Sequence, residues 1–143
     1  MDSNTENTDN TEMLTREQQY AVDVFARVEA FGKLHPKGST ACDKYGAMAH
    51  KLPVLVRTAG LAQALAFVDA RGDESHKQLL ADLAGTVGYA DAHTFVAQSR
   101  TLAFPQYMRL GQKVMAALLW YKRFAQSVLD VAPGTEVEQG GPG

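Results

Sequence analysis

The side chains best suited to chemistry on a partner lie near the C-terminus, between residues 105 and 130. Cations recur there at helical spacings around the chain's single tryptophan, in the set Arg109, Lys113, Ala116, Trp120, Arg123 and Ser127. No Asp or Glu occurs between Pro105 and Leu129, and Lys122 adds a fourth cation on an adjacent face. Positive charge contacts phosphates and an aromatic ring stacks on bases, so this stripe predicts nucleic-acid contact.

The same stripe has a second interpretation. Lys and Arg populate the exposed side of most helices, and Trp120 would then pack against a neighbouring helix. Three cations elsewhere are candidates for a wider basic surface: Arg16, Lys44 and Lys51. The spacing of seven places Lys44 and Lys51 on nearly the same side of a helix. The sequence leaves open whether that side adjoins the stripe.

Catalytic motifs are absent from the sequence. It has no nucleophile elbow, no glycine-rich phosphate loop and no zinc-binding H-E-x-x-H, and its four histidines are far apart. Asp73 and His76 would offer a carboxylate and an imidazole on one turn, but a helix cap beside a solvated histidine is commoner. Cys42 would be reactive at a helix N-terminus, although most lone cysteines are small buried residues. We expect no metal, no cofactor and no enzymatic activity.

Length and charge narrow the partners further. A chain of 143 residues is the size of one domain, and its net charge is -2. Residues 1–12 carry -4 and residues 131–143 carry -2, so residues 13–130 carry -2 + 4 + 2 = +4. This basic excess favours an anionic partner. The single cysteine fits a reducing compartment, and neither a signal peptide nor a membrane span is visible, so we expect a cytoplasmic protein.

Apolar periodicity predicts helices and no strands. The first spans 16–32, with Thr15 and Gln18 as a capping box. The second starts at Ser39 or Thr40 and is kinked or broken at Pro53. The third covers 61–70, the fourth follows Asp73 and ends at Gly88, and Asp91 caps a short fifth. The sixth and longest runs from Pro105 to about Asp130.

These elements predict an all-α fold, a compact bundle of about six helices with a long C-terminal helix. The bundle covers 14–130 as a single domain. The acidic segment 1–13 and the Gly/Pro-rich segment 131–143 are expected to be disordered tails, because they have almost nothing apolar to bury.

The order of several short motifs resembles one known family, the small helical subunit of the type III-B CRISPR effector, the Cmr complex. The resemblance covers about 15–130 and is carried by an ordered set of pieces: Arg16, Gln19-Tyr20-Ala21, Lys44-Tyr45-Gly46, Leu52-Pro53, Gly60-Leu61, Gln63-Ala64-Leu65-Ala66-Phe67, Tyr107 and Trp120-Tyr121-Lys122-Arg123-Phe124-Ala125. Gly111 departs from it, because a better helix former is expected there.

The resemblance implies a non-catalytic structural subunit that stacks with copies of itself into a filament. The filament would lie along the guide RNA–target duplex beside other subunits of the Cmr effector complex. Through the matching motif, the resemblance transfers duplex contact to Lys122 and Arg123. The alternative is a helical protein–protein adaptor with no nucleic-acid contact. A nuclease is disfavoured, because the acids are scattered rather than clustered as metal ligands.

Overall fold

The computed structural model describes residues 14–134, and the segments 1–13 and 135–143, which we expected to be disordered, lie outside the described residues. Six helices and no strand make up the described part, which confirms the expected all-α fold. The helices are α2 (Arg16–Leu34), α3 (Thr40–Ala59), α4 (Leu61–Arg71), α5 (Glu74–Thr86), α6 (Ala92–Thr101) and α7 (Phe104–Ser127).

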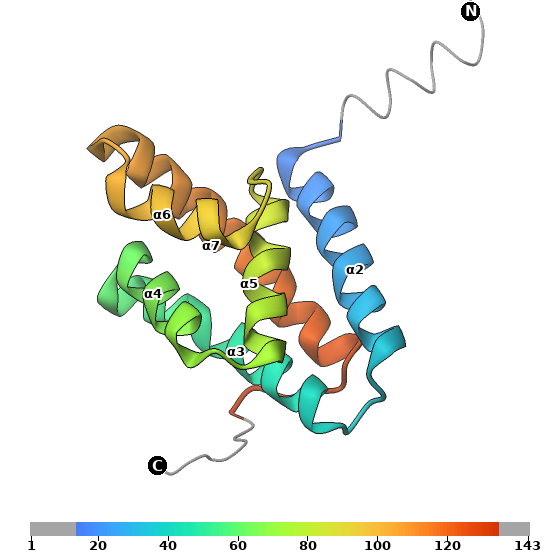
Figure 1. Ribbon diagram of the computed structural model, residues 1–143. Coiled ribbons are helices and arrows are strands. Elements are labelled where there is room, and N and C mark those ends of the chain that lie inside the picture. Colours follow the sequence, from blue (N-terminus) through green and yellow to red (C-terminus); the bar gives the residue numbers. More distant parts are fainter. Residues whose placement is uncertain (1–13, 135–143) are drawn as a thin grey trace, which may run out of the picture.

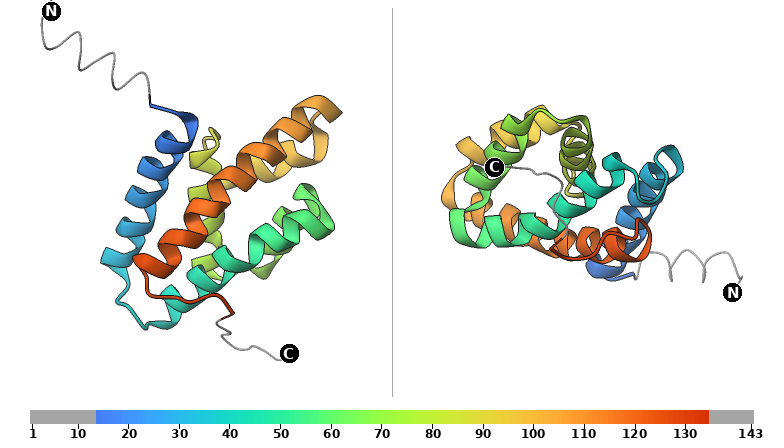
Figure 2. Two further views of the ribbon diagram at one scale, coloured as in Figure 1. Left: turned by 180° about the vertical axis from the view of Figure 1, so that it is seen from behind. Right: turned by 90° about the horizontal axis from the view of Figure 1, so that it is seen from below.

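The helices form two packed groups (Figures 1 and 2). The long helix α7 lies between α2 and α3, and the outer side of α7 is open in the view from behind. Helix α5 crosses the inner side of these three helices and contacts each of them (Figure 1). Helices α4 and α6 pack against α5 and against each other. α5 is therefore the central element of the bundle.

Local signals at the helix starts behave as expected. The Thr15 hydroxyl accepts from the Gln18 amide at 3.0 Å, and Gln18 Oε1 accepts from the Thr15 amide at 2.9 Å, which completes the capping box. Ser39, Asp73 and Asp91 cap α3, α5 and α6 through their side chains. Each cap satisfies a backbone donor that the first turn leaves unpaired.

Pro53 does not break the second helix. α3 is continuous from Thr40 to Ala59, so of the kink or break that we expected, the break is wrong. A proline inside a helix costs about 3 kcal/mol, because it removes one hydrogen bond and crowds the preceding turn. Leu52 and Pro53 are both buried, and burial of their apolar surface opposes that cost.

The packed domain extends beyond residue 130. Asp130 adopts a φ of 62°, which turns the chain so that Leu129 and Val131 are both buried. The Val131 amide donates to the Ala125 carbonyl at 2.9 Å, and His50 Nε2 donates to the Val131 carbonyl at 2.8 Å. Val131, which the sequence placed in the C-terminal tail, is thus part of the core.

One buried and two partly buried polar contacts join α5 to its neighbours. Thr86 Oγ1 donates to Asp23 Oδ2 of α2 at 2.6 Å and lies 2.7 Å from the Tyr121 hydroxyl of α7. Since Thr86 has one hydroxyl proton, Tyr121 is the donor in the second bond. Tyr45 of α3 donates to Asp82 Oδ2 at 2.6 Å. Three helices are therefore hydrogen-bonded to one.

Burial sets the protonation of this group. Burial raises the pKa of Asp82, and hydrogen bonds from Tyr45 and Gln78 offset part of that effect. Burial and the neighbouring Asp82 charge raise the pKa of Tyr45 well above its usual value. Tyr45 therefore keeps the proton that it donates.

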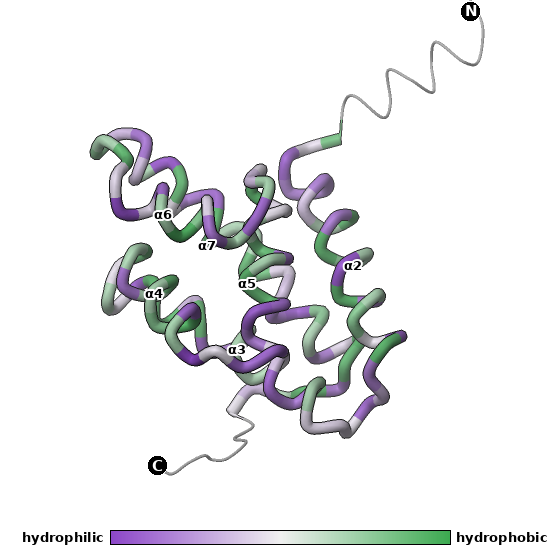
Figure 3. The backbone as a smooth tube through the Cα atoms, viewed as in Figure 1, coloured by the Kyte–Doolittle hydropathy of each residue, from purple (hydrophilic) through white to green (hydrophobic). Residues whose placement is uncertain are grey.

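Each helix is amphipathic. Hydrophilic and hydrophobic segments alternate along the tube in Figure 3, and buried apolar residues from all six described helices form one core cluster. Within residues 14–134, no helix is long and apolar enough to cross a membrane.

Two glycines in helices predict opposite responses to alanine. A Cβ at Gly111 would meet no atom within 4 Å, whereas a Cβ at Gly46 would lie 2.5 Å from Val131 Cβ. We expect Gly111→Ala to raise the free energy of unfolding by about 0.5 to 1 kcal/mol, through lower chain entropy in the unfolded state. Gly46→Ala should lower it by about 1 to 3 kcal/mol through overpacking. Urea denaturation followed by circular dichroism measures both, and shifts of the same sign would contradict this packing.

Candidate nucleic-acid interface

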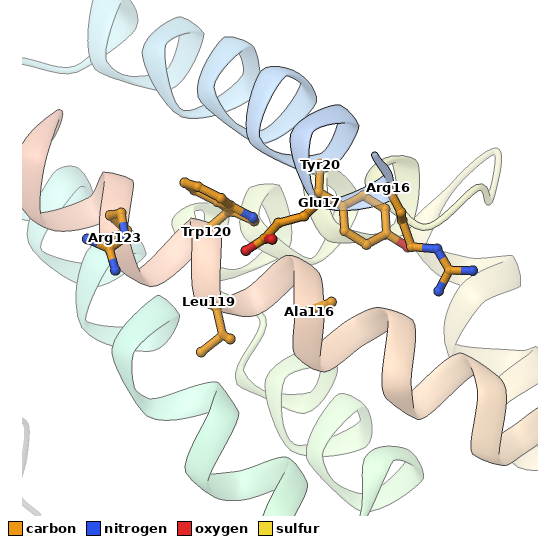
Figure 4. A pocket seen from close by; sticks show the side chains of 7 residues that line it. All are labelled: Arg16, Glu17, Tyr20, Ala116, Leu119, Trp120 and Arg123. Atoms are coloured by element: carbon orange, nitrogen blue, oxygen red, sulfur yellow. The ribbon is translucent and has the colours of Figure 1, made fainter. Parts of the chain in front are cut away.

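An open groove separates the start of α2 from the middle of α7 (Figure 4). Its volume is about 690 Å³. We call it the α2–α7 groove, and it is lined by Arg16, Glu17, Tyr20, Ala116, Leu119, Trp120 and Arg123. In Figure 4, Arg16 and Arg123 lie at opposite ends of the row, with Trp120 and Glu17 between them. The structure thus brings Arg16 together with part of the expected stripe.

Helix starts and spacings place these side chains. The capping box begins α2 at Arg16, so Arg16, Glu17 and Tyr20 lie within its first two turns. The α7 members recur at spacings of three and four, which keeps them on one side of the helix. Further along both helices Phe25 contacts Phe124, so the two helices run in the same direction.

Trp120 belongs to a short aromatic row between the two helices. Its ring stacks on Phe124 with centroids 5.5 Å apart, and Phe124 meets Phe25 edge-on at 5.3 Å. Trp120 is half-buried, and it packs against the core while also lining the α2–α7 groove. The packing interpretation of Trp120 is thus confirmed, and its contact with nucleic acid stays a prediction. The packed side fixes the ring, and the remainder is open to a partner.

The groove cations and their neighbours along α7 lack ion-pair partners in the described part of the chain. Within residues 14–134, no carboxylate lies within 4.0 Å of the charged atoms of Arg16, Arg109, Lys113, Lys122 or Arg123. One acid does line the groove, because α2 contributes Glu17. The acid-free stripe expected from α7 is thus flanked by one carboxylate from a neighbouring helix. Burial raises the pKa of Tyr20, partly offset by Arg16, so the phenol stays neutral.

The remaining candidates are distributed along and away from α7. Arg109 and Lys113 continue the stripe towards the N-terminus of α7, with Arg109 exposed and Lys113 half-buried. Lys122 is exposed but lies about 100° around the helix from Arg123. Lys51 is exposed on α3, on nearly the same side as Lys44. No residue of α3 lines the α2–α7 groove, so the structure does not bring Lys51 to it.

Lys44 has a partner inside the molecule. Its Nζ lies 2.7 Å from Asp73 Oδ2, in a pair whose side chains are 36% and 26% exposed. Burial alone would raise the pKa of Asp73, but hydrogen bonds from Lys44 and from the Ser75 amide outweigh it and lower that pKa. We therefore leave Lys44 out of the interface, although its charge suggested a role there.

Other candidate chemistry does not converge. No group of three or more His, Cys, Asp or Glu able to hold a metal ion occurs in the described part of the chain. Asp73 caps α5 as expected, but His76 is buried rather than solvated, and burial lowers its pKa. Cys42 is fully buried, and its thiol donates to the His35 carbonyl at 3.3 Å.

Comparison with known proteins identifies the family. A sequence model of the CRISPR-associated protein family Cas_Cmr5 matches residues 16–128. The chain belongs to the Cas_Cmr5 family. The family resemblance drawn from the short motifs is thereby confirmed.

A relative and a solved structure agree with this assignment. The chain is 46% identical over 118 residues to the CRISPR system Cmr subunit Cmr5 of Thermus thermophilus, covering 82% of this chain and 99% of the relative. The crystal structure of a Cmr5 family protein from the same organism matches with a TM-score of 0.74 and 46% identity. That match covers 82% of this chain and 99% of the other.

Sequence reasoning missed three groove residues of this Cas_Cmr5 family member. Glu17 and Tyr20 come from α2, and Leu119 is an apolar neighbour of the cationic stripe. Tyr20 was visible in the first-helix motif, but its place beside Trp120 depends on how α2 packs on α7. No spacing within one helix reveals that contact.

The Lys44–Asp73 pair predicts a small, pH-dependent contribution to stability. Because folding lowers the pKa of Asp73, the pair stabilises the fold above the unfolded pKa and loses this effect as the pH falls through the folded pKa. We expect Lys44→Gln to lower the free energy of unfolding by about 0.5 kcal/mol at neutral pH, with a loss that shrinks as the pH falls from 3.8 through the lower folded pKa of Asp73. Thermal unfolding across that range measures it. Lys51→Gln is the control and should have no effect; equal losses in both variants would refute the pair.

Proposed function

We propose that this chain is a non-catalytic structural subunit of an RNA-guided type III-B CRISPR effector, the Cmr complex. It stacks with copies of itself into a filament along the guide RNA–target duplex and contacts that duplex through basic surface. Its partners are other subunits of the complex, and it acts in the cytoplasm. Membership of the Cas_Cmr5 family and the relative named as a Cmr subunit support this assignment.

The duplex contact rests chiefly on one observation, that the cations of the α2–α7 groove have no ion-pair partner within residues 14–134. Arg16 and Arg123 line a groove with an aromatic wall, and Arg109 and Lys113 extend the charge along α7. Cations that already have ion-pair partners would gain little from a phosphate, whereas unpaired ones release counterions on binding. Such a surface reads backbone and shape, which suits a complex whose sequence is read by base pairing.

Stacking and docking are supported by an exposed apolar surface on the same helix. Phe104, Met108 and Leu119 are 73%, 46% and 57% exposed. Their spacings of four and eleven are about one and three helical turns, so they share a side of α7. We call these residues the α7 apolar strip. Contiguous exposed apolar side chains mark sites where another protein binds.

The second candidate function is a protein–protein adaptor without nucleic-acid contact. The α7 apolar strip favours it, and so does the packing of Trp120 on Phe124, which uses part of the ring inside the molecule. In this case the cations would only solubilise the outer face of α7. Two variants separate the candidates.

The first variant reverses two stripe charges. Lys113→Glu with Arg123→Glu should weaken binding to double-stranded RNA roughly tenfold or more, because each loses a phosphate contact and gains a repulsive charge. The slope of log affinity against log salt should fall by about two. Fluorescence anisotropy of labelled RNA measures both.

The matched control carries the same charge change at the far end of the molecule. Lys37 lies in the loop after α2 and Lys77 on the first turns of α5, both exposed. Lys37→Glu with Lys77→Glu should leave RNA affinity within about twofold, apart from the general effect of net charge. Equal weakening by both pairs would remove the groove from the proposal.

The second variant tests the α7 apolar strip without changing charge. We expect Phe104→Gln with Met108→Gln, the two residues of the strip that do not line the α2–α7 groove, to reduce incorporation into the assembled complex, because an interface loses apolar area that it buries. Helicity and RNA affinity of the free chain should stay unchanged. Co-purification of the tagged variant with its partner subunits measures incorporation. Normal incorporation would contradict a role for this strip in assembly.

A further inference from the structure

The charge and position of the N-terminal segment point to an occupant of the α2–α7 groove within the chain itself. We propose that residues Asp2–Glu12, which lie outside the described residues, dock on this groove and on the cationic stripe that continues it. The docking itself depends only on the opposite charges of the segment and the groove and on the length of the segment. Its consequence for RNA rests on the proposed function.

Charge complementarity is the first support. The segment carries Asp2, Glu6, Asp9 and Glu12 and no Lys or Arg, a charge of -4. The surface next to it offers four cations that have no ion pair within residues 14–134: Arg16, Arg109, Lys113 and Arg123. Glu17 is the one acid lining the groove in that part of the chain. The two surfaces are thus opposite in sign and similar in charge.

Reach is the second support. The described chain begins at Leu14, two residues before Arg16, so the acidic segment is attached at the edge of the groove. Thirteen residues span at most about 45 Å when extended. Arg109 and Arg123 are separated by about 21 Å along α7. The segment is therefore long enough to follow the whole stripe.

Attachment strengthens a contact that would be weak between separate molecules. Individual exposed ion pairs contribute little, but a short tether holds the segment at an effective concentration of about a millimolar or more beside its site. The docked segment would present carboxylates where the proposed function places phosphates. It would then compete with RNA, and weak or short nucleic acids would be displaced first. A long duplex held by several stacked copies would displace the segment.

Paramagnetic relaxation tests the docking directly on the full chain. A spin label on Ser3→Cys reports the position of the segment, and Cys42 is fully buried and does not compete for the label. At low salt we expect selective broadening of backbone amides of residues 116–123 and of the Trp120 indole, with α4 unaffected. The broadening should disappear in high salt. Uniform broadening, or none, would overturn the proposal, and broadening that weakens on dilution would assign the occupant to a second copy.

A second experiment measures RNA binding by a variant whose N-terminal segment carries no charge. The variant carries Asp2→Asn, Glu6→Gln, Asp9→Asn and Glu12→Gln, which keep the length of the segment and remove its charge. It should lose the selective broadening and bind a short RNA duplex about fivefold more tightly. The matched control is Glu136→Gln with Glu138→Gln, which removes charge at the other end of the chain and should change neither readout by more than its share of net charge.

The two arms separate this inference from the proposed function. Selective broadening without RNA binding by any variant would uphold the docking and reject RNA contact. RNA binding that is equal in the native and charge-neutral chains, without broadening, would uphold RNA contact and reject the docking.

Discussion

The Thr86 hydroxyl is the contact on which the arrangement of the bundle depends. It sits on α5 between the Asp23 carboxylate of α2 and the Tyr121 hydroxyl of α7, and it bonds to both. A turn earlier on α5, Asp82 accepts from Tyr45 of α3. Apolar packing alone tolerates sliding of one helix along another, whereas hydrogen bonds fix which residues face each other. Leaving the buried Tyr45–Asp82 bond unmade would cost about 1 to 3 kcal/mol. These bonds therefore set the axial register of α2, α3 and α7.

The α2–α7 groove follows from this register. Arg16 lies seven residues before Asp23, two turns along α2, and Trp120 adjoins Tyr121 on α7. The hydrogen bonds of the Thr86 hydroxyl to α2 and α7 therefore also set how the groove side chains of these two helices lie relative to each other. Nearby, the Arg27 side chain bonds Asp23 and approaches α5 so closely that a Cβ at Gly85 would lie 2.6 Å from its guanidinium.

Local sequence signals predicted the helices, but they could not predict which residues of different helices are in contact. Caps such as Thr15 and the apolar period set helix starts and buried faces, because both arise within a few residues. The continuity of α3 through Pro53 and the burial of Val131 depend on what packs against them. The same holds for the site. The α7 cations were visible as a stripe, but the pairing of Lys44 with Asp73 and the entry of Glu17 into the groove require knowledge of neighbouring helices.

Net charge is a poor guide to what this surface offers, because several acids serve the interior or the helix ends. Asp23 and Asp82 accept hydrogen bonds from Thr86 and Tyr45 between helices, and Asp73 and Asp91 cap helices. Among residues 14–134, no ion pair makes a comparable demand on the α7 cations, which stay available to a partner. At Glu17, the stability of a helix start and the positive charge of the groove place opposite demands on one residue. An acid in the first turn of α2 is favoured by the helix dipole, yet it lowers the positive potential of the groove beside it. The anion binding that we propose for this surface would therefore be weakened by the same residue that helps α2 to begin.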